Sequence, residues 1–256
     1  MHVRVLGAHN LETTKAHHTC FLIDGKIAID AGSLVSTLSR DEQMRIEHVL
    51  LTHLHFDHTR DLPTLGLQTL DHPHTIDVHS LPVTLATVNQ QLMNGEFYPD
   101  LTQKLNDTPP ALRFKEIRDR DVRTIAGYDV QPVDADHPVP TIGYLVQRGG
   151  RTIGYTGDTG GPLLPFMQQA LTPDILFVDV TFPNDLRWRA EASKHLTPSM
   201  LRSRIVEARQ AGVTLPRIVP VHMSEANRPQ ILKELADVER ELGIDLEPGY
   251  EGMETG

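Results

Sequence analysis

A histidine-rich stretch directly after an apolar segment is the feature that most constrains the fold of this chain. Residues 52–58 read T-H-L-H-F-D-H and follow the apolar run Val49-Leu50-Leu51. Such a run is typical of the end of a buried strand, and α/β folds place functional side chains at that end. Imidazole and carboxylate groups together are ligands for zinc, manganese or iron. The stretch therefore predicts a metal site at a sheet edge, with four candidate ligands: His53, His55, Asp57 and His58.

Three further stretches each place a His or an Asp next to a predicted strand end. They are Asp136-His137-Pro138, Gly157-Asp158-Thr159 and Val221-His222-Met223. Each stretch alone is weak evidence, because a strand-end Asp is usually a turn former. Histidine is also abundant, with 14 in 256 residues, so a chance cluster in a surface loop is the alternative. Taken together with residues 52–58, however, the stretches supply enough ligands for two metal ions.

The composition fits a protein of the cytoplasm. A chain of 256 residues with 39% hydrophobic content suits one α/β domain spanning residues 1–256. The sequence lacks an apolar run of the roughly 18 residues that a membrane span needs. Residues 1–7 read as a strand rather than as a signal peptide, and the single cysteine, Cys20, excludes an internal disulfide. We therefore expect a cytoplasmic protein without a membrane partner.

The charge of the chain narrows the class of substrate. The formal net charge is −10 at pH 7. Binding of duplex DNA or structured RNA needs Lys and Arg side chains that neutralise phosphates, so long nucleic acid is disfavoured as the main partner. A small anionic substrate remains compatible, because bound divalent cations would reverse the sign of the local charge.

Turn signals and hydrophobic periodicity predict two strand-rich halves with interleaved helices. Hairpins are expected over residues 19–29 and over residues 141–155, with turns at Asp24-Gly25 and at Gly149-Gly150. Buried strands are expected at residues 175–180 and 217–221, and helices at residues 36–45, 62–70, 83–93, 198–211 and 229–242. This order predicts two mixed sheets packed face to face, with helices outside.

Residues 72–135 are the least regular part of the sequence and are expected to be partly an insertion or lid region. Residues 94–110 contain Gly, Pro and Asp and look like a loop that closes over the site. His72, His74 and His79 are expected at exposed positions around a short strand.

In the order of its candidate ligands, the chain resembles the metallo-β-lactamase superfamily of dinuclear metallohydrolases. The match runs from Asp30 to His222 and is carried by His53-x-His55-x-Asp57-His58, His137, Asp158 and His222. The resemblance implies an α/β fold, the four-layer αββα sandwich, with two divalent metal ions between the sheets at one edge. Zinc is the favoured metal, with manganese or iron as alternatives.

The resemblance also implies how the ligands are shared. One metal takes His53, His55 and His137, the other takes Asp57, His58 and His222, and Asp158 bridges them. A hydroxide between the metals would be the nucleophile, and Asp57 could orient it. Asp30, Thr52 and Asp61 are candidates for hydrogen bonds that orient the imidazole rings, with ordinary turn or cap bonding as the alternative.

A second pair of motifs resembles the phosphodiesterase branch of the superfamily. Residues 178–184 read V-D-V-T-F-P-N and residues 193–198 read S-K-H-L-T-P, which is similar to class II cyclic-nucleotide phosphodiesterases and comparable to ribonuclease Z. The resemblance implies that His195 is a catalytic residue oriented by Asp179, because an imidazolium can give a proton or a charge-assisted hydrogen bond to a phosphodiester. We therefore expect a dinuclear phosphodiesterase that opens a small phosphodiester, foremost a 3′,5′-cyclic nucleotide of the cyclic AMP type, to the 5′-monophosphate.

Several alternatives stay open. A ribonuclease Z-like nuclease is one, although the sequence has no long basic insertion for gripping tRNA. A hydrolase of lactones or thioesters is another, and a diiron redox protein or nucleotide sensor is a third, which His55 disfavours because diiron relatives usually have Glu there. Residues 59–63 lack the glycine that often follows the first motif, and Lys194 stands where many relatives have Gly. Arg187 and Arg189 are either substrate contacts or a solvated pair, and a homodimer is compatible with the resemblance.

Overall fold

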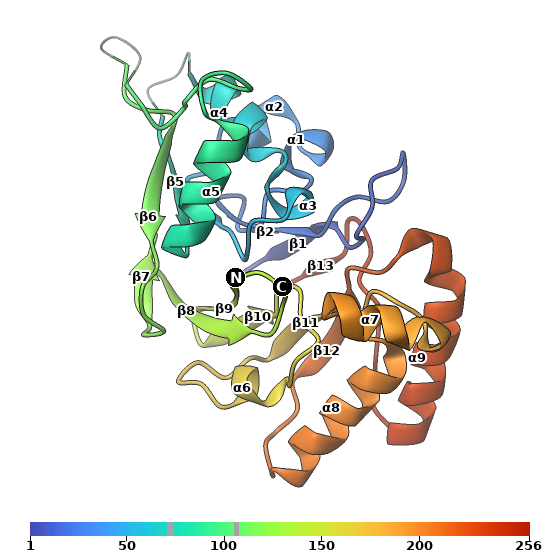
Figure 1. Ribbon diagram of the computed structural model, residues 1–256. Helices are drawn as coiled ribbons and strands as arrows, with labels where there is room; N and C mark the ends of the chain where they lie inside the picture. Colours follow the sequence, from blue (N-terminus) through green and yellow to red (C-terminus); the bar gives the residue numbers. More distant parts are fainter. Residues whose placement is uncertain (71–73, 105–107) are drawn as a thin grey trace.

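Two facing sheets organise the protein. The computed structural model describes residues 1–70, 74–104 and 108–256. Among these residues the strands form two mixed sheets, and helices cover both outer faces (Figure 1). The first sheet has the order β13-β1-β2-β3-β4-β5-β6, and the second has the order β12-β11-β10-β9-β8-β7. The predicted α/β fold, a four-layer αββα sandwich, is confirmed.

The elements have the following bounds within the described residues. The first sheet contains β1 (Val3–Gly7), β2 (Cys20–Ile23), β3 (Ile27–Ile29), β4 (His48–Leu50), β5 (Ile76–Ser80), β6 (Leu112–Glu116) and β13 (Glu254–Thr255). The second contains β7 (Arg123–Ile125), β8 (Tyr128–Ala135), β9 (Thr141–Arg148), β10 (Arg151–Tyr155), β11 (Ile175–Asp179) and β12 (Arg217–Val221). The α-helices are α1 (Leu34–Thr37), α2 (Arg40–Gln43), α3 (Phe56–Thr59), α4 (Leu62–Thr69), α5 (Pro82–Leu92), α6 (Leu164–Met167), α7 (Arg187–Ser193), α8 (Pro198–Gln210) and α9 (Arg228–Leu242).

Both predicted hairpins are present, and their turns use the residues that the sequence singles out. The β2–β3 turn contains Asp24 and Gly25 with φ angles of 46° and 70°. The β9–β10 turn contains Gly149 and Gly150 with φ angles of 61° and 77°. Two successive positive φ angles match the twist of the flanking strands, which is why Gly and Asp suit these positions.

Three apolar layers hold the sandwich together. The middle layer lies between the sheets and is centred on Phe21, whose ring centroid is 4.8 Å from that of Tyr155 and 4.6 Å from that of Phe177. One outer layer packs α1, α4 and α5 on the first sheet, and the other packs α6, α8 and α9 on the second (Figure 1). Each large side chain that is fully buried in these layers contributes about 1.5–3 kcal/mol. Among the described residues, no helix is both long and apolar enough to cross a membrane.

The prediction of one helix over residues 36–45 is wrong, because the structure has two short helices here, α1 and α2. Leu38 and Ser39 adopt extended backbone conformations between the two short helices. The Ser39 side chain accepts a hydrogen bond from the backbone of Glu42, and the Glu42 carboxylate accepts one from the backbone of Ser39. This reciprocal capping box starts a new helix at Arg40 rather than continuing the first one.

Residues 72–135 contribute strands to both sheets: β5 and β6 to the first, β7 and β8 to the second. Because β4, β5 and β6 are parallel, their C-terminal ends share one edge, where residues 52–58 follow β4. Residues 94–110 instead lead from α5 to the start of β6, at the opposite edge. The expectation of a lid over the site is therefore wrong for the described part of this loop, residues 94–104 and 108–110.

The histidines predicted to be exposed around residue 75 differ in how deeply they are buried. His72 lies outside the described residues. His74 is half-buried, and its Nε2 lies 2.6 Å from the carbonyl oxygen of Ile46. His79 is buried, so the expectation of exposure is wrong for it. The reason is that β5 is an interior strand of the sheet, paired on both sides by β4 and β6.

Candidate metal centre

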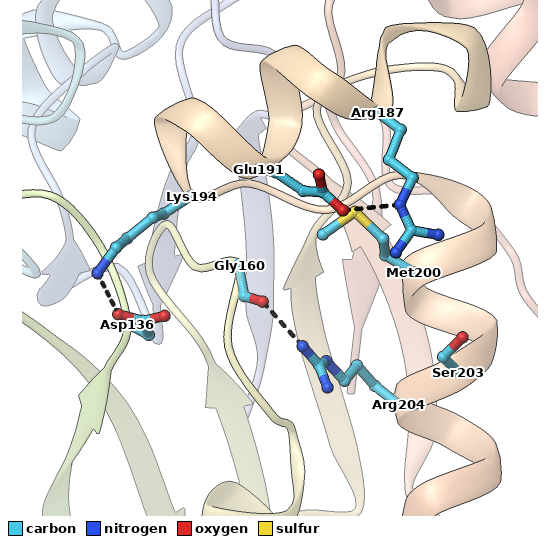
Figure 2. A pocket seen from close by; sticks show the side chains of 8 residues that line it. All are labelled: Asp136, Gly160, Arg187, Glu191, Lys194, Met200, Ser203 and Arg204. Carbon is cyan, nitrogen blue, oxygen red and sulfur yellow. Dashed lines mark hydrogen bonds and ion pairs between the residues drawn. The ribbon is translucent and has the colours of Figure 1, made fainter.

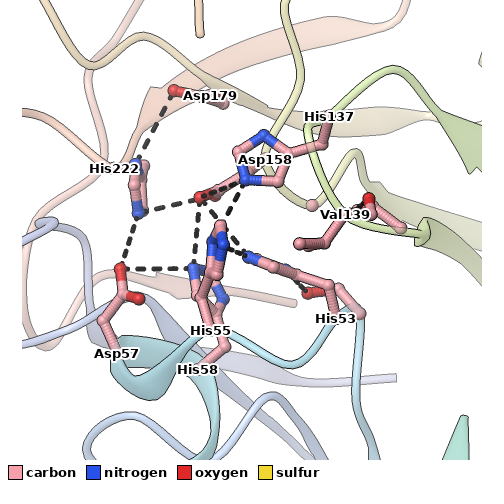
Figure 3. Close-up of polar contacts among 12 residues, drawn as sticks. His53, His55, Asp57, His58, His137, Val139, Asp158, Asp179 and His222 are labelled. Atoms are coloured by element: carbon pink, nitrogen blue, oxygen red, sulfur yellow. Dashed lines mark hydrogen bonds and ion pairs between the residues drawn. The ribbon is translucent and has the colours of Figure 1, made fainter. Parts of the chain in front are cut away.

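Strand ends from both sheets converge at one edge of the sandwich. The end of β4 leads to residues 52–58, and the ends of β10 and β12 lead to Asp158 and His222. His137 comes from the loop between β8 and β9. The seven predicted ligands, which are far apart in the sequence, point toward one another across the gap between the sheets (Figure 3).

One group of candidate ligands consists of three histidines and Asp158. Nε2 of His53 lies 3.0 Å from Nδ1 of His55, which lies 3.2 Å from Nε2 of His137. Oδ2 of Asp158 lies 3.8 Å from Nε2 of His53 and 4.0 Å from Nε2 of His137. The ligand atoms of the group all lie within 4.8 Å of one another, close enough to hold one ion.

The second group shares Asp158 and adds Asp57, His58 and His222. Nε2 of His222 lies 3.3 Å from Oδ2 of Asp57 and 3.4 Å from Oδ1 of Asp158. Nε2 of His58 lies 3.5 Å from Oδ2 of Asp57 and 3.4 Å from Oδ2 of Asp158. Asp158 therefore faces both groups, as expected of a bridging carboxylate.

Hydrogen bonds behind the rings assign the nitrogen that each histidine turns toward the centre. The Thr52 hydroxyl donates to Asp30 at 2.9 Å, so it accepts from Nδ1 of His53 at 3.0 Å. Nδ1 of His58 donates to Oδ2 of Asp30 at 2.7 Å. Both rings therefore present the lone pair of Nε2 to the centre, the arrangement that metal-binding histidines show. The predicted orienting roles of Asp30 and Thr52 agree with this geometry.

A matching network holds the ligands that come from the second sheet. The Thr181 hydroxyl donates to Oδ1 of Asp179 at 2.6 Å and accepts from Nδ1 of His222 at 2.8 Å. Nδ1 of His137 donates to the carbonyl oxygen of Lys194 at 3.3 Å. Thr181 and the Lys194 carbonyl are the site partners that our sequence analysis missed. The spacing of Asp179 and Thr181, two residues apart at the end of a strand, was the available signal for Thr181.

Asp61 does not contact a candidate ligand, contrary to one of our expectations. Its carboxylate accepts hydrogen bonds from the backbone of Val35 at 2.7 Å and from Nε of Arg60 at 3.1 Å. The alternative of ordinary cap bonding therefore fits this position, because Val35 lies in the first turn of α1.

The donor set fits divalent metal ions. Nε2 of His58 and Oδ1 of Asp158 are buried polar atoms without a hydrogen-bond partner, and both are directed into the centre. Unpaired buried polar atoms are costly in a folded protein, and coordination of a cation would satisfy both. Five imidazoles and two carboxylates are ligands that zinc, manganese and iron accept.

The Asp158 carboxylate of the centre is held in its charged form, as binding of a cation requires. Although burial opposes ionisation, His222 and His58 hold the pKa of Asp158 well below its usual range. Burial lowers the pKa of His137 to about 4 and that of His53 well below its ordinary value. Burial has the same effect on His222, but Asp158 and Asp179 outweigh it and raise the pKa to about 10. The extra proton that this raised pKa keeps on the His222 ring is displaced when a metal ion binds.

Asp179 and His195 form a buried pair beside both ligand groups. Nδ1 of His195 lies 2.7 Å from Oδ2 of Asp179, which also accepts a hydrogen bond from the backbone of Thr159 at 3.0 Å. The His195 ring stacks on His222 at a centroid distance of 5.3 Å and lies 5.2 Å from His137. Burial disfavours the charged imidazole, but the Asp179 carboxylate outweighs it and raises the pKa of His195.

A cavity of about 300 Å³ is lined by residues of α7 and α8 together with Asp136, the neighbour of His137, and Gly160 (Figure 2). Lys194 bonds Asp136 across it at 2.5 Å, and Arg204 donates to the carbonyl oxygen of Gly160 at 3.2 Å. Arg187 also lines the cavity and pairs with Glu191 at 2.8 Å.

Arg189 points elsewhere than Arg187. Its guanidinium lies 5.0 Å from the ring centroid of Phe182, whereas Trp188 between the two arginines is exposed. The two arginines therefore do not act as one pair.

Comparisons with known proteins agree with the geometry. A family model described as a beta-lactamase superfamily domain matches residues 21–223. Ribonuclease Z of Haloferax volcanii is 24% identical over 244 residues, which cover 75% of this chain and 73% of that protein. Ribonuclease Z of Mycolicibacterium gilvum is 30% identical over 130 residues, which cover 45% of this chain and 44% of that protein.

Solved structures show the same fold at low sequence identity. Unliganded yeast PDE1 is 17% identical with a TM-score of 0.80, and the match covers 99% of this chain and 98% of that one. The short form of human tRNase Z is also 17% identical, with a TM-score of 0.70 and coverage of 100% and 99%. The family match over most of the chain, the shared sandwich and the His/Asp groups at its edge lead to one conclusion: this chain belongs to the metallo-β-lactamase superfamily of metal-dependent hydrolases.

Proposed function

We propose that this protein is a dinuclear metal-dependent phosphodiesterase, with zinc as the favoured metal. Its proposed substrate is a small phosphodiester, foremost a 3′,5′-cyclic nucleotide that is opened to the 5′-monophosphate. The observation that carries the proposal is the Asp179–His195 pair beside both ligand groups. A metal centre alone suits many hydrolytic reactions, so it is this pair that favours a phosphodiester.

The pair is built to present one nitrogen to a substrate. Asp179 is fully buried and accepts the Nδ1 proton of His195, so the free nitrogen of the ring is Nε2. The His195 side chain is 12% exposed, and its ring packs beside those of His137 and His222. A proton held at Nε2 can pass to an ester oxygen as it leaves phosphorus, or can stabilise charge on a phosphoryl oxygen.

The remaining groups of the chain complete the proposed reaction. Divalent ions held by the seven candidate ligands would make hydroxide available near neutral pH and would neutralise phosphate charge. Asp57 accepts a hydrogen bond from the attacking water, since its side chain is 26% exposed whereas that of Asp158 is 1% exposed. The water releases one proton to solvent as its oxygen bonds to phosphorus, the bond from phosphorus to the 3′-oxygen breaks, and the proton of His195 passes to that oxygen.

A second candidate function is a ribonuclease Z-like nuclease. Its support is the similarity to ribonuclease Z proteins over most of this chain. Its weakness is the net charge of −10, which opposes the close approach of a long polyanion. Both candidate functions use the same centre, so the substrate rather than the site distinguishes them.

Product analysis tests the proposal. Purified protein is incubated with cyclic AMP, with a tRNA precursor and with a lactone, each with added Zn²⁺ or Mn²⁺ and with a chelator as control. We expect 5′-AMP from cyclic AMP and no product in the chelated sample. Cleavage of the precursor without turnover of cyclic AMP would favour the nuclease. Turnover of the lactone alone would reject phosphodiester chemistry.

A further inference from the structure

We propose that His48, Asp77 and His79 form a second cation site, separate from the candidate metal centre, for one zinc-class divalent ion. His48 begins β4 and pairs in register with Asp77 of the parallel strand β5, and His79 follows two residues later. Side chains two residues apart on a strand share a face, so all three lie on one face of the sheet. Leu50, on the same face of β4, belongs to the apolar layer between the sheets. The cluster therefore opens toward the space between the sheets.

The spacing of the three side chains suits a single ion. Nδ1 of His48 lies 3.2 Å from Nε2 of His79, and an oxygen of Asp77 lies within 4.8 Å of both nitrogens. Two nitrogen ligands of a tetrahedral zinc ion are about 3.4 Å apart, because each Zn–N bond is about 2.0–2.1 Å. The candidate metal centre shows the same spacing, 3.2 Å, between Nδ1 of His55 and Nε2 of His137. Two imidazoles and one carboxylate also leave a coordination position for water.

The positive charges around the cluster decide how tightly it binds. Nε of Arg113 donates to Oδ1 of Asp77 at 2.6 Å, and Lys115 pairs in register with His79. The Arg113 side chain is 54% exposed whereas that of Asp77 is 13% exposed, so Arg113 is the partner that can turn into solvent. A half-exposed ion pair adds little stability, and a divalent ion can displace it. Arg113 therefore weakens the site without blocking it.

Equilibrium dialysis against buffered Zn²⁺, followed by elemental analysis of the protein, tests the proposal. The full-length wild type is compared with His79→Gln, with Asp77→Asn and with the control His74→Gln, which changes a neighbouring histidine outside the cluster. We expect the wild type and the control to bind one more ion per chain than the other two variants. We also expect Arg113→Ala to fill this additional site at about tenfold lower free Zn²⁺, because a neighbouring positive charge is removed.

Loss of zinc binding in His79→Gln could also result from misfolding of that variant. A gain of Zn²⁺ affinity in Arg113→Ala cannot result from misfolding, so it tests the site independently. Equal stoichiometry in the wild type and His79→Gln at every Zn²⁺ concentration would overturn the proposal. An unchanged binding curve in Arg113→Ala would overturn it as well. Neither result depends on hydrolytic activity, so the proposed phosphodiesterase function is tested separately.

Discussion

Single residues that hydrogen-bond to the candidate ligands fix the orientation of the ligand side chains. Thr181 is the clearest case, because its one hydroxyl joins Asp179 to the ring of His222.

Two residues of the candidate site adopt left-handed backbone conformations: Asp30 with φ of 61° and His222 with φ of 63°. Residues other than glycine rarely adopt this conformation, and such strain gathers at functional sites.

The variant Thr181→Val tests the role of the hydroxyl. Valine keeps the shape of threonine but can neither accept the His222 proton nor donate to Asp179. We expect Zn²⁺ affinity to fall about 10–100-fold, the usual effect of losing a hydrogen bond behind a metal-binding histidine. Thr181→Ser keeps the hydroxyl and is expected to bind Zn²⁺ like the wild type, as measured by competition with a chelating dye. Equal affinity of the valine and serine variants would contradict the assigned role.

The variant His195→Ala tests the catalytic residue of the proposed function. We expect kcat for bis(p-nitrophenyl) phosphate to fall roughly 10²–10⁴-fold, the typical contribution of general acid–base catalysis. Metal content is expected to remain unchanged, because His195 is not among the seven candidate ligands. His74→Ala is the matched control, since His74 bonds a backbone carbonyl remote from the centre. Wild-type kcat in His195→Ala would remove this residue from the mechanism.

At the scale of elements, the end of α7 positions two functional groups at once. Lys194 closes this helix with φ of 53°, its carbonyl oxygen accepts from His137, and His195 follows it directly. A side chain at Gly160 would place its Cβ 3.0 Å from Cα of Lys194, so the two backbones are in close contact. The left-handed turn therefore sets the directions of the candidate ligand His137 and of His195 together.

Backbone strain at this turn can be measured by comparing Lys194→Gly with Lys194→Ala. Both variants lose the ion pair with Asp136, so their difference reports the backbone alone. Glycine adopts positive φ without a steric penalty, and we expect the glycine variant to be more stable by about 1 kcal/mol. Urea unfolding of both variants gives this difference. A more stable alanine variant would show that residue 194 is not strained.

The sequence predicts an element well where interactions between neighbouring residues, such as helix capping, decide its structure. Thr197 caps α8 by accepting from the backbone of Met200, as expected of a Thr before a Pro at the helix start. The break at Ser39 was missed because apolar periodicity continues across it, while the capping box works against that periodicity. The place of β5 and β6 in the first sheet was also missed, because parallel pairing joins segments that are distant in sequence.

At the scale of the whole molecule, the two ends of the chain close the first sheet together. β1 pairs with β13, and the two termini lie near each other (Figure 1). The Glu251 carboxylate joins these ends: it lies 2.6 Å from Nδ1 of His9 and accepts from the backbone of His17 at 3.0 Å. Burial opposes its ionisation, but these hydrogen bonds lower the pKa of Glu251 to about 2.

This lowered pKa predicts a pH dependence of stability. A carboxylate whose pKa falls on folding stabilises the native state above its unfolded pKa, which is near 4.5 for Glu251. That contribution is lost as the pH falls through about 2. We therefore expect Glu251→Gln to lower the free energy of unfolding at pH 7 by about 1.5–3 kcal/mol. The difference from the wild type should shrink between pH 4.5 and pH 2 in urea unfolding, and a constant difference would contradict the assignment.

The candidate site could be located from the sequence because its ligands follow strand ends in a recognisable order. All seven predicted ligands, together with Asp179 and His195, come together at one edge of the sandwich. The supporting contacts were harder to foresee. Those to Thr181 and to the Lys194 carbonyl depend on packing between segments up to 57 residues apart, which residue spacing alone does not encode.

The most direct test of the central claim is a zinc titration of metal-free protein, with hydrolysis of bis(p-nitrophenyl) phosphate measured at each step. The His79→Gln variant is titrated beside the wild type, so that the proposed second cation site does not affect the stoichiometry. We predict that the activity of the His79→Gln variant rises until about two Zn²⁺ ions per chain are bound, as a two-metal mechanism requires. Full occupancy without diester cleavage, or cleavage by the metal-free protein, would contradict the claim.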